Sequence, residues 1–307
     1  MGDLNVIYRS NSHAPLWILL DKVGIWEQNG LKVDTSPQLH REKAVDALRS
    51  GSVDVISGNH HNLFVRRLKG EDFVHLAQVG NRWTETRLVM NGGLKGVADL
   101  KGKRVALGRG TSHEGLNVWL FLRQEGLDAD RGDVQLVDAG SSSDRWNGVV
   151  TGDFDATFVG APYDLRAARE GATVVSVRPM PMIRGVTLTT TMTVMREREP
   201  DIRALVRGLV EGIHFFLTRR EETLSVLRDH AMSVLGLESE EEVQAIYDEW
   251  CGFLERKPYP TTEAIDNVFA LALRRNPEVA GLNPLSLWDT HYLRELDDTG
   301  FIDALYE

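Results

Sequence analysis

Short apolar runs alternate with amphipathic stretches along the first part of the chain. An apolar run at residues 4–9 precedes a polar turn, and residues 16–30 then show the apolar spacing of one helix that ends at a glycine. A second apolar run, residues 31–38, leads into a helical pattern at residues 40–51 and a buried-type strand at residues 53–58. This alternation predicts parallel strands covered by helices, and hence an α/β fold.

The chain changes character in the glycine-rich segment at residues 91–103, after which strand and helix patterns resume over residues 104–171. We interpret this segment as a crossing into a second α/β domain. A further strand pattern at residues 185–195 is followed by amphipathic helical patterns at 199–231, 239–257 and 262–276. The predicted organisation is therefore a first part of lobe 1 (1–92), lobe 2 (93–185), and a return to lobe 1 with C-terminal helices (186–307).

Composition narrows the functional classes. The 307 residues are 42% hydrophobic and 26% charged, as in a globular protein. A net charge of −10 argues against nucleic acid as a partner, since phosphate contacts need clustered Lys and Arg. The single cysteine, Cys251, excludes an internal disulfide and a cysteine-rich metal site. The chain contains no run of about 18 apolar residues, so the sequence does not predict a membrane-spanning helix.

The first residues, "MGDLNVIYRSNSHAPLW", lack the basic segment and the apolar stretch of a secretory signal. On the sequence as written we expect a cytoplasmic protein. The alternative is a periplasmic protein from which a signal peptide was removed.

Several segments together resemble a known group. The segment "APLWILLDKVGIWEQNGLKVDTS" resembles the opening of the solute-binding proteins for sulfonates, taurine and nitrate, and "AVDALRSGSVDVISG", "LKGKRVALGRGTSHEGL" and "VVTGDFDATFVGAPY" agree with it in order. The resemblance implies a two-lobed, periplasmic-binding-protein-like fold of type 2, with the ligand in a cleft between the lobes. The same superfamily includes aromatic sulfinate desulfinases, thiamine pyrimidine synthases and certain decarboxylases. The fold therefore leaves carrier and catalyst both open.

Histidines gather in the loops expected after the strands, where open α/β sheets bind ligands. These loops are residues 10–13, 58–62, 108–113, 140–144 and 160–163. Four of the nine histidines lie in them: His13, His60, His61 and His113. Each could instead lie in solvent or cap a helix. The catalytic candidates are His60 and His61 as general acid or base, with Ser12 and His13 as a possible nucleophile and base.

A second set of candidates is suited to binding an anion. Backbone N–H groups, hydroxyls and a guanidinium near a helix start would hold a carboxylate, sulfinate or phosphate. The predicted ligand-binding residues are Asn59, Arg109, Gly110, Thr111, Ser112, His113, Ser141, Ser142 and Tyr163. The alternative for the serines and Thr111 is an ordinary helix N-cap. Trp17 and Trp146 could stack on a planar ligand, whereas we expect Phe64 to lie in the core.

We expect no metal ion and no cofactor, because the chain has neither an H-E-x-x-H pattern nor a set of cysteine ligands. The desulfinases carry a cysteine in the first strand-end loop, where this chain offers Ser12 and His13. The thiamine pyrimidine synthases carry a cysteine-rich iron motif that a chain with one cysteine cannot supply.

The first hypothesis is a cofactor-independent lyase or hydrolase, decarboxylase-like or desulfinase-like, that acts on a small, aromatic carboxylate or sulfur oxyanion. The alternative is an ABC-transporter solute-binding protein of the sulfonate, taurine or nitrate type, with a permease as its partner. In both cases the expected ligand is a small organic anion.

Overall fold

The computed structural model describes residues 2–8, 11–35, 41–58, 60–83 and 86–307, which form two compact units. Unit 1 comprises Met1–Arg82, Pro181–Val243 and Phe253–Glu307. Unit 2 comprises Trp83–Met180 and Gln244–Gly252. Each unit contains one five-stranded sheet and is described by itself.

The sheet of unit 1 has the strand order β2-β1-β3-β10-β4. Its strands are β1 (Gly2–Tyr8), β2 (Leu31–Asp34), β3 (Val55–Ser57), β4 (Phe73–Trp83) and β10 (Met180–Thr191). Strand β1 is parallel to β2 and to β3, with Leu4 opposite Val33 and Val6 opposite Val55, and β10 is antiparallel to β3. The parallel arrangement predicted for the first three strands is confirmed.

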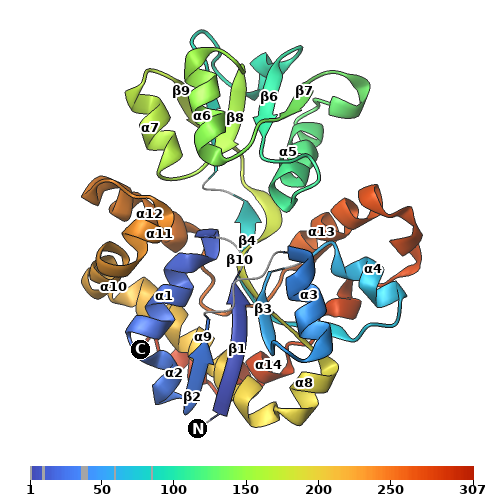
Figure 1. The fold of residues 1–307 in the computed structure, drawn as a ribbon, viewed down its shortest axis with the longest axis vertical. Coiled ribbons are helices and arrows are strands. Elements are labelled where there is room, and N and C mark those ends of the chain that lie inside the picture. Colours follow the sequence, from blue (N-terminus) through green and yellow to red (C-terminus); the bar gives the residue numbers. More distant parts are fainter. Residues whose placement is uncertain (1, 9–10, 36–40, 59, 84–85) are drawn as a thin grey trace. The chain divides into compact units, whose positions relative to one another are not determined.

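Helices lie on both sides of this sheet, with α1 and α9 to one side of strands β1 to β3 and α3 to the other (Figure 1). The helices that lie wholly in unit 1 are α1 (Ala14–Lys22), α2 (Ile25–Gln28), α3 (Arg41–Ser50), α4 (Leu63–Leu68), α8 (Met192–Glu197), α9 (Glu199–Thr218), α10 (Arg220–Val226), α11 (Met232–Leu235), α13 (Thr262–Arg275), α14 (His291–Asp298) and α15 (Phe301–Ala304). Short 3-10 turns occur at Asn11–His13, Pro277–Gly281 and Pro284–Leu287.

Glycines decide how the first helices pack. Gly24 has φ 71°, so its left-handed backbone divides the single helix predicted at residues 16–30 into α1 and α2. On α9, a Cβ at Gly212 would lie 2.0 Å from Leu20 Cδ2, and one at Gly208 would lie 2.8 Å from the Trp26 ring. The absence of side chains at these two positions lets α9 approach α1 and α2 closely.

One further expectation is wrong, and one strand was not expected. The single helix predicted at residues 199–231 ends at Thr218, because Arg219 leaves the helical region (φ −110°, ψ 64°), and the chain continues as α10 and a π-helical turn, Leu227–Ala231. Strand β4 has no counterpart among the elements that the sequence pattern predicts. Nearly every residue of β4 is buried, so its sequence lacks the alternation that identifies a half-buried strand.

The sheet of unit 2 has the strand order β7-β6-β8-β5-β9. Its strands are β5 (Arg87–Met90), β6 (Arg104–Leu107), β7 (Gln135–Asp138), β8 (Ala156–Val159) and β9 (Thr173–Ser176). Strand β6 is parallel to β7 and β8, whereas β5 is antiparallel to β8 and β9. The helices are α5 (His113–Gln124), α6 (Ser142–Thr151), α7 (Tyr163–Arg169) and residues 244–252 of α12 (Glu240–Phe253), with 3-10 turns at Val97–Leu100 and Ala129–Arg131.

Strand β8 supplies both faces of the unit 2 core. Phe158 packs edge-on against Phe121 of α5, with ring centroids 5.7 Å apart. The next residue, Val159, belongs to the opposite cluster, with Val149 of α6 and Ala167 of α7. Because successive strand residues point to opposite faces, one buried strand ties the helices on both sides to the sheet.

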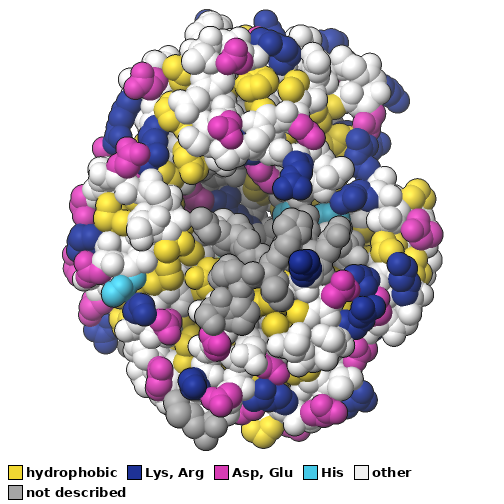
Figure 2. Space-filling model, viewed as in Figure 1, with side chains coloured by type: hydrophobic (Ala, Val, Ile, Leu, Met, Phe, Trp, Pro, Cys, Tyr) yellow, Lys and Arg dark blue, Asp and Glu magenta, His cyan; other side chains and the backbone are white. Residues whose placement is uncertain are grey.

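The surface carries charges of both signs. On the face shown in Figure 2, Lys and Arg side chains are interspersed with Asp and Glu. In the described ranges, no helix is both long enough and apolar enough to cross a membrane.

Candidate functional site

In unit 1, His13 lies at the carboxyl ends of β1 and β3, as predicted. Its Nδ1 is 2.8 Å from the hydroxyl of Ser57, the last residue of β3, whose side chain is buried. A Cβ added at Gly58 would lie 3.2 Å from His13 Cε1, and Gly58 also has φ 93°. A glycine at position 58 therefore allows both the turn after β3 and the close approach of the imidazole.

His60 begins a hydrogen-bonded chain that reaches β4. Its Nε2 lies 2.6 Å from Thr187 Oγ1, and the Thr187 hydroxyl donates to Gln78 Oε1. The Gln78 amide nitrogen donates to the carbonyls of Gly80 and Arg184, both at 2.6 Å, which fixes the orientation of the amide. A hydroxyl has one proton to donate, so Thr187 must accept from the ring. His60 therefore carries a proton on Nε2.

His75 of β4 makes a similar contact with Thr189, two residues after Thr187 on β10. Its Nδ1 lies 2.8 Å from Thr189 Oγ1, and the Thr189 hydroxyl donates to the carbonyl of Gly58 at 3.0 Å. By the same accounting, His75 carries its proton on Nδ1. Burial, with a smaller contribution from the positive charge of Arg67, lowers the pKa of His75 to about 3. The His75 ring is therefore neutral near pH 7.

These contacts join predicted and unpredicted residues in one cluster. The His60 and His75 rings are 6.1 Å apart between centroids. The sequence pattern does not indicate five members of this cluster, because it does not reveal β4 and because threonines are common in strands such as β10. These members are Ser57, His75, Gln78, Thr187 and Thr189. Among the other candidates, His61 is 2% exposed, Ser12 is exposed, and Asn59 lies outside the described residues.

In unit 2, the predicted anion-binding loops follow β6 and β7, and their backbone donors contact carboxylates of the chain itself. Gly110 N–H donates to Asp138 Oδ1 at 2.7 Å. Ser141 N–H donates to Asp144 Oδ2 at 2.8 Å, and Ser141 and Asp144 form a capping box on α6. Ser112 caps α5 by accepting from Gly115 N–H at 3.1 Å. The helix-cap alternative is confirmed for Ser112 and Ser141.

The remaining predicted residues lie around these caps. Arg109 and Thr111 are exposed, and His113 is the first residue of α5. Tyr163 begins α7 and is partly buried against the core of unit 2. In the loop between β8 and α7, Ala161 N–H donates to Glu249 Oε2 at 2.9 Å. A carboxylate of the chain therefore also contacts this third loop.

Replacing Gly115 by alanine is expected to reduce the free energy of unfolding by about 2 kcal/mol, as for other overpacked sites. A Cβ at Gly115 would lie 2.2 Å from the backbone oxygen of Arg109, and a backbone atom cannot move aside as a side-chain end does. Urea denaturation measures the change. Gly92→Ala is the control, since its Cβ would meet nothing within 4 Å. Equal stability of the two variants would contradict the steric argument.

A buried cation lies beneath the loops of unit 2. Arg145 of α6 is 2% exposed, and its Nη2 lies 2.5 Å from Glu114 Oε1, while Nη1 lies 3.1 Å from Glu114 Oε2. Nη2 also approaches Ser142 Oγ (3.2 Å) and the carbonyl of Phe158 (3.4 Å). The guanidinium thus lies at the carboxyl end of β8. Arg145 is not among the residues predicted from the sequence, because nothing in its local pattern distinguishes it from a surface arginine of a helix.

The aromatic candidates have structural roles. Trp17 is buried and stacks on Tyr8, with ring centroids 6.1 Å apart. Phe64 is buried and packs edge-on against Phe269, which confirms its expected core position. Trp146 packs partly buried against the core of unit 2.

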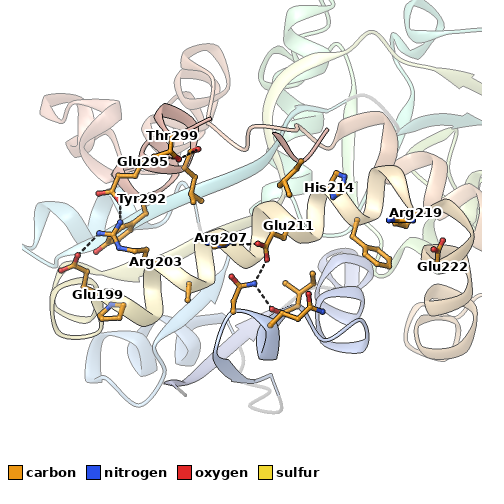
Figure 3. A pocket seen from close by; sticks show the side chains of 18 residues that line it. Glu199, Arg203, Arg207, Glu211, His214, Arg219, Glu222, Tyr292, Glu295 and Thr299 are labelled. Carbon is orange, nitrogen blue, oxygen red and sulfur yellow. Dashed lines mark hydrogen bonds and ion pairs between the residues drawn. The ribbon is translucent and has the colours of Figure 1, made fainter. Parts of the chain in front are cut away.

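A groove of about 1130 Å³ runs along α9 in unit 1, between α2 and α14 (Figure 3). Two of its arginines are paired with carboxylates: Arg203 with Glu199 at 2.9 Å and with Glu295, and Arg207 with Glu211 at 3.0 Å. Within the described part of the chain, none of the predicted strand-end residues lines it. The groove is therefore distinct from the histidine cluster. Among the described residues, no three His, Cys, Asp or Glu side chains converge as metal ligands would.

Comparisons with solved structures identify the fold. The periplasmic aliphatic sulphonate binding protein SsuA from Escherichia coli superposes with a TM-score of 0.67 and 19% identity, over 95% of this chain and 99% of that chain. A mutant of DszB in complex with biphenyl-2-sulfinic acid superposes with a TM-score of 0.64 and 14% identity, over 97% and 99% of the two chains. At these identities the similarity shows the fold alone. The expected periplasmic-binding-protein-like fold is confirmed.

Sequence comparisons identify the family. A Brucella abortus protein, named as a candidate binding protein, is 32% identical over 114 residues, which are 37% of this chain and 34% of that protein. The match thus spans about a third of the curated relative's length. The family model described as NMT1/THI5 like matches residues 10–223, more than half of the chain. The protein therefore belongs to the NMT1/THI5-like family.

Proposed function

We propose that this protein is a solute-binding protein for a small organic anion, such as a sulfonate, and that His13 and His60 of unit 1 contact the ligand. The observation that carries the proposal is the cluster of imidazoles anchored to hydroxyls at the carboxyl ends of β1 and β3. The two nitrogens of an imidazole point in different directions. A hydroxyl on one nitrogen fixes the orientation of each ring at the strand ends, where open α/β sheets bind their ligands.

The comparisons support this function over the lyase or hydrolase hypothesis. The family match covers most of the chain, the Escherichia coli protein of the same fold is named for sulfonate binding, and the Brucella relative is named for binding. We further propose that the protein acts in the periplasm and delivers its ligand to an ABC permease, because a solute-binding protein of an ABC transporter must meet its permease there.

One observation favours an enzyme as the second candidate. The His13 to Ser57 hydrogen bond of 2.8 Å has the geometry of a base and a nucleophile, and DszB has the same fold. Two features weigh against this candidate. Ser57 is 1% exposed, which restricts access of a substrate carbon to its oxygen, and the lowered pKa of His75 makes it unsuitable as a general acid near pH 7.

The experiment is a thermal-shift screen with ethanesulfonate, biphenyl-2-sulfinate and benzoate, followed by mass spectrometry of each anion that binds. We expect the retained anion to be recovered chemically unchanged. His60→Gln should weaken its binding by about tenfold, because the amide cannot keep the position that the ring holds against Thr187. His230→Gln, at an exposed position in unit 1, is the control and should bind as the wild type does.

Two results would contradict the proposal. Conversion of a bound anion to a product by the wild type, and its loss in His13→Gln, would establish the enzyme. Equal affinity of the His60→Gln and His230→Gln variants would show that the ligand does not contact the histidine cluster.

A further inference from the structure

The loops after β6, β7 and β8 form a rim on unit 2 that binds carboxylates of the chain itself. Backbone N–H groups in the loops after β6, β7 and β8 each donate to a carboxylate of the chain, from Asp138, Asp144 and Glu249. A fourth carboxylate, Glu114, lies on Arg145. Three of these contacts are between backbone and side chain, and only the fourth involves a buried cation.

The surroundings of Arg145 hold its guanidinium in a fixed position. The hydroxyl of Ser142 and the carbonyl of Phe158 accept hydrogen bonds from Nη2. A Cβ at Gly108 would lie 2.8 Å from Nη1, so a side chain at this position would push the guanidinium aside. Nε of Arg145 is buried and has no hydrogen-bond partner among the described residues. The guanidinium is thus rigid, buried and at the strand ends.

Glu114 is the more exposed partner of this buried cation. Its side chain is 41% exposed, against 3% for Arg145, and its two oxygens bind Nη1 and Nη2 in parallel. Protein atoms crowd around the carboxyl group and raise its pKa, although the charge of Arg145 opposes that rise. Burial therefore opposes the charge of this carboxylate, and Arg145 stabilises it.

We propose that Arg145 is an anion-binding group of unit 2 and that Glu114 is a resident carboxylate which the anionic group of the ligand displaces. Two parallel N–H···O bonds are the arrangement by which a guanidinium binds a carboxylate, and sulfonates and sulfate offer two oxygens in the same way. A buried guanidinium without a counter-charge is unfavourable, so a resident carboxylate stabilises the ligand-free state. This inference rests on the proposed function in taking the ligand to be an organic anion.

The test compares Glu114→Gln with Asp144→Asn, using inorganic sulfate as the probe. Both changes remove one negative charge from the same rim, but the hydrogen bonds of Asp144 go to Ser141, whereas those of Glu114 go to the buried Arg145. The melting temperature of each variant is measured in sodium sulfate and in sodium chloride of equal ionic strength. We expect Glu114→Gln to bind sulfate at least about tenfold more tightly than the wild type, with Asp144→Asn unchanged.

Arg145→Lys keeps the charge but removes the paired donors. Combined with Glu114→Gln, it should abolish the gain in sulfate affinity. Should this double variant fail to fold, the comparison of Glu114→Gln with Asp144→Asn decides the matter. The inference is overturned if Glu114→Gln binds sulfate no more tightly than Asp144→Asn does.

The outcomes also separate this inference from the proposed function. If the wild type retains ethanesulfonate but Glu114→Gln gains nothing for sulfate or for ethanesulfonate, the function stands and the Arg145 subsite does not. If no organic anion of the screen binds to the wild type while Glu114→Gln gains sulfate affinity, the subsite stands and the proposed function fails.

Discussion

The free energy of unfolding is expected to fall by about 3 kcal/mol between pH 7 and pH 4 because of His75 alone. In the folded protein the pKa of this imidazole is lowered from 6.5 to about 3 by burial and by Arg67. Below pH 6.5 the unfolded chain therefore takes up a proton that the folded chain does not. Stability is lost as the pH falls from 6.5 towards 3, and full stability is present above that window.

His75→Asn tests this expectation, since an asparagine amide can still donate to Thr189. The variant should be less stable at pH 7, because the smaller side chain leaves a cavity. Between pH 6 and pH 4, however, its unfolding free energy should fall less steeply than that of the wild type. The difference in slope corresponds to about one proton taken up on unfolding. Urea denaturation at several pH values gives both curves. Parallel curves would show that His75 does not contribute to the acid sensitivity.

Thr187→Val is expected to lower the free energy of unfolding by about 3 kcal/mol, although valine has nearly the same shape as threonine. The change removes the oxygen that accepts from His60 and donates to Gln78. Two buried polar groups then lose a partner, and each costs about 1 to 3 kcal/mol. Thr187→Ser should recover most of the loss, because it keeps the hydroxyl.

Thr190→Val provides a matched control on the same strand. Thr190 is also buried, and its hydroxyl donates to the carbonyl of Asp54 at 2.7 Å. This substitution removes the donor of a single carbonyl, whereas Thr187→Val removes a partner from two side chains. We therefore expect the free energy of unfolding to fall by only about 1 kcal/mol. Equal losses in Thr187→Val and Thr190→Val would contradict the hydrogen-bonded chain from His60 to Gln78.

The α/β class, the parallel strands β1, β2 and β3 of unit 1 and the loops after them follow from the amino-acid sequence. Apolar runs, helical spacing and glycines act over a few residues, so they are legible without the fold. The cap given as the alternative for Ser112 is local in the same way, because its side chain binds Gly115 only three residues away. The sequence also placed His13 and His60 at the ends of β1 and β3.

Only the tertiary structure decided what those side chains contact. The bond from His60 to Thr187 joins residues 127 apart, and that from His13 to Ser57 joins residues 44 apart. Such pairs depend on which strands are neighbours and in which register, and no local pattern encodes this. His75 remained undetected because its strand is buried on both faces. Arg145 was missed for a related reason: its partner, Glu114, lies on another helix, and the two meet only where the ends of β6 and β8 bring α5 and α6 together.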